Sequence, residues 1–250
     1  EIGWCDWSSD VCSSDLPMLL VNEVTKKYDK ILANDKVSIT LNNGEVGVLV
    51  GPNGSGKSTL IKCIAGLLRY TGDIEIDGLP NKTIEAKRLL GYIPEVPNLY
   101  DTMTIDEHFE FIRRAYGYSD KTLTEELIER FELTEHRKKL GKALSKGMQQ
   151  KVSIVCALLH DPQVVIFDEP MVGLDPHAIN ELKHVIRELK EKNKAILIST
   201  HLIDTVADIW DVVNILKSGH VIVTKYREQL NGQEENLSDL FFEITENKEQ

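Results

Sequence analysis

The segment GPNGSGKS, from Gly51 to Ser58, has the spacing of a phosphate-binding loop. It fits the pattern GxxxxGK followed by Ser or Thr, and it stands between an apolar run and a helix-forming run. The glycines let the chain curl so that successive N–H groups face a phosphate, and Lys57 adds a cation for the β- and γ-phosphates. The Ser58 hydroxyl is a candidate ligand for Mg²⁺. The predicted nucleotide-binding residues are Gly51, Pro52, Asn53, Gly54, Ser55, Gly56, Lys57, Ser58 and Thr59.

Two adjacent carboxylates, Asp168 and Glu169, follow the apolar run VVIF. A buried strand ending here would bring them beside the phosphate loop, where two carboxylates can divide the work of phosphoryl transfer. Asp168 is predicted to serve the metal, and Glu169 to polarise the water that attacks the γ-phosphate. A solvated acidic turn is the alternative, and the neighbouring phosphate loop disfavours it.

A histidine, His201, follows another strand-like run, AILIST. A lone histidine after a strand is more often a cap than a catalyst. In an open α/β sheet, however, the strand ends converge on the ligand crevice. We therefore predict that His201 is catalytic together with Glu169.

A second pattern that suits an anion begins at LSKGM, Leu144 to Met148. It puts Ser145 and Gly147 at the start of a helix, where the first backbone N–H groups have no partner within the helix. These groups and the positive end of the helix dipole favour an anion. The alternative is that LSKGM is the start of an ordinary capped helix with no ligand, and this motif alone does not distinguish the two.

A scaffold must bring these residues together. From Met18 onward, strand-like and helix-like segments alternate along the sequence. This alternation is typical of an α/β fold with a largely parallel sheet. The predicted strands are MLLVNEV, VSITL, EVGVLVG, GDIEIDG, Gly91 to Pro94, QVVIFDEP, KAILIST and DVVNILKSG. Helical patterns follow the phosphate loop, run throughout Thr104 to Leu159, and start again near Pro176 and near His201.

Composition narrows the classes of partner. The 250 residues include 40 acidic and 29 basic side chains, giving a net charge of −11. Proteins that bind nucleic acids usually carry a basic face, so no nucleic-acid partner is expected. No apolar run approaches the ~18 residues that cross a bilayer, so any membrane role would depend on a partner. The four cysteines form no CxxC pair, so neither disulfide nor zinc chemistry is expected.

The two ends of the chain differ from the middle. Residues 1–17 include two of the three tryptophans, show no strand or helix period, and lack the pattern of a signal peptide. We expect a non-native, disordered segment there with Met18 as the natural start, the alternative being a genuine floppy terminus. The acidic tail 226–250 is expected to hold one short helix.

In order and spacing these pieces resemble the nucleotide-binding domain of ABC transporters, over Leu19 to about Lys225. The resemblance implies an α/β fold with a P-loop NTPase (RecA-like) core and an antiparallel β subdomain. It also implies a helical ABC-specific subdomain at about 95–160, within an ATP-binding domain over 18–225. ATP and Mg²⁺ are the implied ligands. LSKGM corresponds to the family's signature motif, usually written LSGGQ.

The resemblance also implies a second nucleotide-binding domain, in a homodimer or a heterodimer. Each phosphate loop would face the partner's signature helix, so Ser145 and Gly147 are expected to contact the γ-phosphate of ATP held by the other subunit. MVGLDP resembles the D-loop, with Asp175 placed to touch the opposite phosphate loop, and His201 resembles the switch histidine. Tyr28 resembles the aromatic residue that stacks on adenine, with simple packing as the alternative.

Two positions depart from the family pattern. Glu95, in GYIPEVPNLY, stands where the family usually has a glutamine that helps to hold Mg²⁺ and senses the membrane partner. A carboxylate can still contact a metal but adds negative charge beside a triphosphate, so we expect ATP binding with altered metal dependence or coupling. A Glu95 that points to solvent is the alternative. Lys146 stands in place of the first glycine of the signature motif, and the resulting sequence SKGM resembles one that is common in exporter-type cassettes.

The implied function is the ATPase subunit of an ABC transporter on the cytoplasmic face of the cell membrane, bound to separate integral membrane subunits and favouring export. ATP binding would close the dimer and hydrolysis would reopen it. The segment Glu95 to Thr104, with Pro97, Leu99 and Tyr100 as apolar contacts, is the predicted docking site. The alternative is a soluble ABC ATPase such as an iron–sulfur cluster assembly subunit. A catalytically dead regulatory module is disfavoured because the predicted catalytic residues are present.

Overall fold

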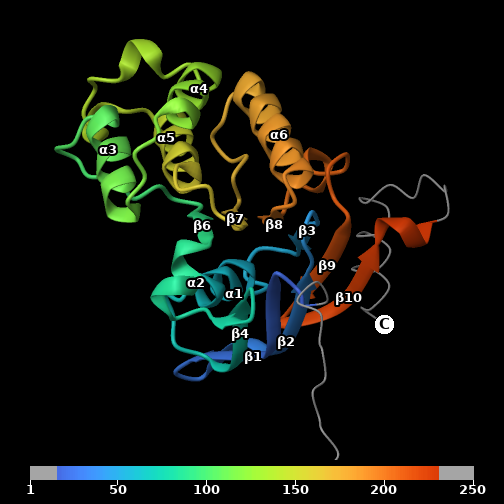
Figure 1. The fold of residues 1–250 in the computed structure, drawn as a ribbon. Coiled ribbons are helices and arrows are strands. Elements are labelled where there is room, and N and C mark those ends of the chain that lie inside the picture. Colours follow the sequence, from blue (N-terminus) through green and yellow to red (C-terminus); the bar gives the residue numbers. More distant parts are fainter. Residues whose placement is uncertain (1–15, 231–250) are drawn as a thin grey trace, which may run out of the picture.

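The computed structural model describes residues 16–230, which form two β-sheets and a group of helices (Figure 1). The predictions of a non-native segment over 1–17 and of a short helix in the tail 226–250 fall almost entirely outside these residues. Within 16–230, no helix is both long and apolar enough to cross a bilayer.

The larger sheet has six strands in the order β10-β9-β3-β8-β7-β6, and β10 pairs antiparallel with β9 while the other five run parallel. Its strands are β3 (Val46–Val50), β6 (Leu90–Ile93), β7 (Val164–Asp168), β8 (Ala195–Thr200), β9 (Val212–Lys217) and β10 (His220–Tyr226). Every residue of β3, β7 and β8 is buried, which explains why they read as continuous apolar runs. Since parallel strands end at one edge of a sheet, the segments after β3, β7 and β8 meet there.

The smaller sheet is antiparallel, with the order β2-β1-β4-β5. Its strands are β1 (Leu19–Tyr28), β2 (Ile31–Leu41), β4 (Thr71–Ile76) and β5 (Leu79–Pro80). Helix α1 (Lys57–Ile64) packs its buried face, which includes Leu60 and Ile61, into a core shared by residues of both sheets. The helix that begins at the phosphate loop is thus held from two sides.

The helical part consists of α3 (Ile105–Tyr116), α4 (Thr122–Arg130) and α5 (Lys146–Leu158). A capping box between Thr104 and Glu107 starts α3, and Gly117, in the left-handed region, ends it. The expectation of helix throughout Thr104 to Leu159 is therefore wrong for 117–121 and 131–145, where only two 3₁₀ turns occur, Thr134–His136 and Gly141–Ala143.

Helix α6 (Pro176–Glu191) begins at the predicted place, with Asp175 as its cap and Pro176 in its first turn. The helix expected near His201 is wrong: only a 3₁₀ turn, Ile203–Thr205, follows. Here the Leu202 amide donates to the Thr200 hydroxyl and the Thr205 hydroxyl donates to the Leu202 carbonyl, so side chains take up backbone groups that a helix would use. Helix α2 (Ile84–Arg88) and strand β10 were not predicted. The 3₁₀ turn Arg227–Leu230 lies in the tail for which one short helix is predicted.

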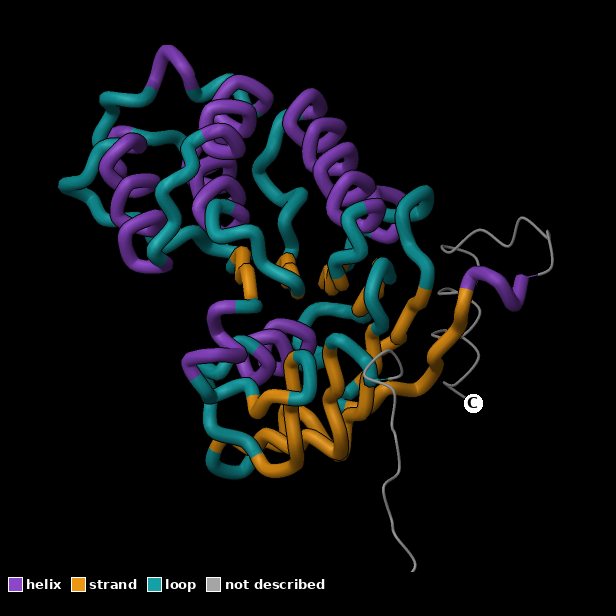
Figure 2. Tube along the Cα trace, in the orientation of Figure 1, coloured by secondary structure: helices purple, strands orange, loops and turns teal. Residues whose placement is uncertain are grey.

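The elements form layers about the larger sheet. Helices α3 to α6 gather on one side, and α1 with the antiparallel sheet lies on the other (Figure 2). Two apolar cores correspond to these layers: one contains Phe109 of α3, Phe131 after α4 and Leu182 of α6, and the other contains α1 and the antiparallel strands. The α/β fold with an antiparallel sheet and a helical part is as predicted.

Candidate functional site

The loop between β3 and α1 is shaped by glycines. Gly51 lies so close to β9 that a Cβ there would come 2.2 Å from the Leu216 carbonyl oxygen. Gly56, the N-cap of α1, has φ 106°, and a Cβ on it would come 2.4 Å from the Ala33 carbonyl oxygen. Because a glycine cap has no side chain to accept from the helix, the first N–H groups of α1 are left for an outside acceptor.

A cavity of about 490 Å³ lies over this loop. It is lined by residues from Asn53 to Thr59 other than Ser55, and by Glu95, Glu169 and His201, which follow β6, β7 and β8. The structure thus brings together side chains that are far apart in sequence, because the parallel strands end at the same edge of the sheet.

Asp168 lies beneath the loop and is 1% exposed. Its Oδ1 accepts hydrogen bonds from the hydroxyls of Ser58, at 3.0 Å, and Ser199, at 2.7 Å, while among residues 16–230 its buried Oδ2 finds no hydrogen-bond partner. Burial raises the pKa of Asp168, against the effect of the two hydroxyls. A hydroxyl beside an unpartnered carboxylate oxygen is a donor set that suits Mg²⁺.

Glu169 is held in one position by its surroundings. Its backbone is left-handed, with φ 50°, and its amide donates to both oxygens of Ser199 at 3.1 Å. Its Oε1 lies 3.9 Å from Lys57 Nζ, and its Oε2 lies 2.9 Å from His201 Nδ1 and accepts from the His201 amide at 3.3 Å. The carboxylate therefore sits between a lysine and a histidine at the cavity wall.

Lys57 lies across the phosphate loop, where its ammonium donates to the carbonyl oxygens of Gly51, at 2.7 Å, and Pro52, at 3.2 Å. Burial lowers the pKa of Lys57, while Glu169, Asp168 and Glu95 act in the opposite direction. Lys57 lines the cavity, where its side chain can reach a bound phosphate.

The structure places Tyr28 outside the residues that line the cavity. It lies at the end of β1, 42% exposed, with Lys26 Nζ 4.7 Å from its ring centroid. Ile31, Leu32 and Ala33, just across the hairpin turn, do line the cavity, and the sequence analysis missed them. An apolar pair at the exposed tip of an edge hairpin was the available signal. Ser218 and Gly219, the turn after β9, also line the cavity and were missed.

Ser145, Gly147 and Asp175 also lie outside this lining. Ser145 caps α5 by accepting from the Met148 amide at 3.3 Å, and Asp175 caps α6 by accepting from the Ala178 amide at 2.9 Å. A Cβ on Gly147 would come 2.7 Å from the Gly173 carbonyl oxygen, so α5 and the turn before α6 are in close contact. We call the surface that carries these three residues the second face, and none of them lines the cavity over the phosphate loop of the same chain.

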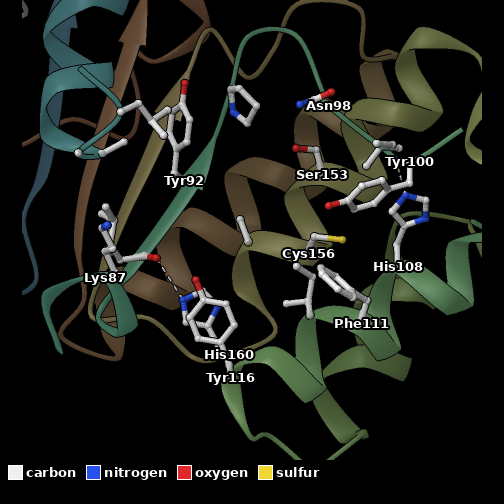
Figure 3. A pocket seen from close by; sticks show the side chains of 18 residues that line it. Lys87, Tyr92, Asn98, Tyr100, His108, Phe111, Tyr116, Ser153, Cys156 and His160 are labelled. Atoms are coloured by element: carbon white, nitrogen blue, oxygen red, sulfur yellow. Dashed lines mark hydrogen bonds between the residues drawn. The ribbon is translucent and has the colours of Figure 1, made fainter. Parts of the chain in front are cut away.

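A groove of about 480 Å³ separates α1 and α2 from α3 and α5 (Figure 3). Its lining includes Leu99 and Tyr100 but not Pro97. His108 holds the wall in place, because its Nε2 accepts from the Tyr100 amide at 2.9 Å and its Nδ1 lies 2.7 Å from the Thr104 carbonyl oxygen. At the other end the rings of Tyr116 and His160 stack with centroids 3.9 Å apart.

Comparison with known proteins agrees with this geometry. The family model described as "ABC transporter" matches residues 34–172. The chain is 37% identical to the ABC-type transporter ATP-binding protein EcsA of Bacillus subtilis, over 92% of this chain and 97% of that protein.

Solved structures agree as well. One of an ATP-binding subunit of an ABC transporter superposes with a TM-score of 0.84 at 36% identity, covering 91% of this chain and 99% of that one. A dimeric ATP-binding cassette in a post-hydrolysis state, bound to ADP and Pi, gives a TM-score of 0.74 at 26% identity, covering 84% and 98%. The chain therefore belongs to the ATP-binding proteins of ABC transporters and is the ATPase subunit of such a transporter.

Proposed function

We propose that Glu169 is the residue that activates water for ATP hydrolysis in this chain. The observation that carries this proposal is the fixed carboxylate of Glu169 between Lys57 and His201 at the wall of the cavity. Lys57 and the loop amides would hold the phosphates, and the Glu169 carboxylate would take a proton from the attacking water. His201, 40% exposed on its side chain, would contact the γ-phosphate while it stays oriented by Glu169.

The same site would bind Mg²⁺ through Ser58 and Asp168, with Glu95 at the cavity mouth as a third oxygen donor. The bound ion would neutralise charge on the β- and γ-phosphates. Asp168 is suited to this role because its free Oδ2 is buried next to the Ser58 hydroxyl. The Tyr28 ring remains a candidate for stacking on adenine. Ile31 and Leu32 add an apolar surface to the lining of the cavity.

Two chains would be needed for a complete site. Ser145 and Gly147 do not line the cavity over their own phosphate loop. In a head-to-tail dimer they would reach the γ-phosphate held by the other subunit, and Asp175 would approach the other phosphate loop. The dimeric cassette bound to ADP and Pi supports this arrangement. The sequence leaves a homodimer and a heterodimer equally open.

The groove would dock a short amphipathic helix of an integral membrane subunit, at the cytoplasmic face of the membrane. Its rim exposes three large apolar side chains: Leu67 is 63% exposed, Tyr100 57% and Phe111 45%. The apolar face of the docked helix would cover these side chains. Export stays a prediction that rests on the SKGM wording around Lys146.

The catalytic proposal is tested with Glu169→Gln in the purified chain. We expect hydrolysis to fall by ~10²- to 10⁴-fold because the general base is lost, while ATP binding persists and a dimer accumulates in size-exclusion chromatography. A double variant that also carries Lys57→Met should stay monomeric. Undiminished turnover by Glu169→Gln would remove Glu169 from the role of base.

The docking proposal is tested separately, by membrane fractionation of cells that express the whole transporter. Tyr100→Glu should release the chain from the membrane fraction because it puts a charge on the apolar rim. Tyr118→Glu is the matched control: Tyr118 is 41% exposed but does not line the groove. Equal retention of both variants would exclude this groove as the docking site.

A further inference from the structure

Two segments of the second face are joined by an ion pair that the proposed catalytic steps do not use, between a buried lysine and a half-exposed aspartate. Lys151, on α5, is 8% exposed, and its Nζ lies 3.0 Å from Asp175 Oδ2 and 3.9 Å from Glu132 Oε2. The other oxygen of Asp175, Oδ1, accepts from the Ala178 amide. Both oxygens of this carboxylate are thus engaged within its own chain.

The ion pair connects two elements that would face the partner subunit. Lys151 belongs to the helix that starts at Ser145, and Asp175 is the cap of α6. Gly147 also lies close to the Gly173 carbonyl oxygen. This contact joins the same two segments about one helical turn nearer to the N-terminus of α5. A steric contact and a charged contact therefore fix α5 relative to the turn 171–175.

We infer that Lys151 is a positioning residue, which holds Ser145, Gly147 and the turn at Asp175 as one rigid surface for the partner's nucleotide. This inference rests on the proposed dimer. In this arrangement the ion pair with Lys151 orients the turn at Asp175, so that the turn approaches the opposite phosphate loop in a fixed position. A surface that is already ordered before association loses less conformational freedom when two subunits close on ATP.

The test uses the full chain with Glu169→Gln, in which ATP-driven dimers accumulate. Sedimentation gives the dimer dissociation constant, and a fluorescent ATP analogue gives the nucleotide affinity of the monomer. Lys151→Met should raise the dimer dissociation constant by ~10-fold or more, because it leaves the partner face unfixed and Asp175 without its cation. The monomer's nucleotide affinity should not change, since the phosphate loop lies elsewhere. Lys151→Arg should restore dimerisation.

A matched control separates positioning from the general loss of a buried lysine. Lys194 is 5% exposed and pairs with Asp161 at 3.2 Å, away from the second face. Lys194→Met should lower thermal stability about as much as Lys151→Met while dimerisation stays intact. Asp175→Asn keeps an N-cap oxygen but loses the charge, so it should weaken the dimer alone and add little to Lys151→Met.

The outcomes separate the two proposals. If Glu169→Gln itself fails to dimerise with ATP, the proposed dimer is wrong and the inference falls with it. If Glu169→Gln dimerises and both Lys151→Met and Asp175→Asn dimerise equally well, only the role of Lys151 is wrong. Equal weakening by Lys194→Met would also overturn it, because the effect would then come from lost stability. If Lys151→Met does not fold, Asp175→Asn alone decides.

Discussion

Two helix N-termini in this chain are suited to phosphate, and they are built differently. Helix α1 starts at a glycine, carries Lys57 at its first position, and opens into a cavity with Glu169 and His201 on its wall. Helix α5 starts at Ser145, whose hydroxyl already accepts from the Met148 amide, and no lining residue of that cavity comes from it. The first terminus can bind a nucleotide within one chain, whereas the second becomes useful only when another molecule brings a phosphate to it. Substitutions at each terminus test this contrast.

The largest effect should come from Lys57→Met. Loss of the cation that we propose binds the β- and γ-phosphates should weaken ATP binding by the monomer by about 10- to 100-fold, as expected for a charge-assisted hydrogen bond. Isothermal titration with ATP measures it. Lys62→Met, on the outward face of the same helix, should bind ATP as the original chain does. If both variants bind ATP normally, α1 is not the self-sufficient terminus.

Gly147→Ala should give the opposite pattern. A Cβ 2.7 Å from the Gly173 carbonyl oxygen forces α5 or the turn before α6 to move, with a cost of about 1–3 kcal/mol for overpacking. We expect the monomer to bind ATP unchanged, and the ATP-driven dimer of the Glu169→Gln chain to weaken by about 10-fold. A loss of ATP binding by the monomer would mean that the two termini are not independent.

Two aspartates should respond to substitution with opposite signs. Asp168→Asn removes a buried charge whose free oxygen has no partner in the described chain, so without nucleotide or Mg²⁺ it should stabilise the protein by about 1 kcal/mol at pH 7. Asp175→Ala removes a helix cap and the partner of Lys151, so it should destabilise the protein by about 1–2 kcal/mol. Urea unfolding measures both, and a shared sign would contradict the contrast.

The smallest effect is the pH dependence of these two carboxyl groups. The pKa of Asp168 is raised, so the native state holds its proton to higher pH than the unfolded chain, and this group's contribution to stability falls as pH rises above about 4. The pKa of Asp175 is lowered by the Ala178 amide and by Lys151, so its contribution is present above about pH 4 and is lost as pH falls. Urea unfolding of Asp168→Asn and Asp175→Asn between pH 3 and 7 should show stability differences from the original chain that change in opposite directions.

Much of the scaffold could be predicted from local patterns. The buried strands β3, β7 and β8 read as apolar runs that end at a glycine, a carboxylate and a threonine, and α6 starts at its Asp-Pro cap. The helix predicted near His201 is absent, and a 3₁₀ turn takes its place. Here the hydroxyls of Thr200 and Thr205 bond to backbone groups that a helix would use, which the local pattern does not show. Strand β10 was missed because a half-exposed edge strand has no continuous apolar run.

The site divides in the same way. Phosphate chemistry could be predicted at Lys57, Asp168, Glu169 and His201, because each of these residues follows an apolar run closely in the sequence. The apolar lining at Ile31 and Leu32 was missed, since it reaches the cavity from the antiparallel sheet through a contact that spacing does not reveal.

Local sequence is enough to predict the phosphate loop, the carboxylates after β7 and the alternation of strands and helices, because each depends on residues that are neighbours in the chain. The folded structure was needed to show that Glu169 lies between Lys57 and His201, that Ser145 and Gly147 do not line the cavity over their own phosphate loop, and that Lys151 pairs with Asp175. Each of these relations joins residues that are far apart in the sequence. They arise only when the sheets and helices pack together, so local patterns cannot reveal them.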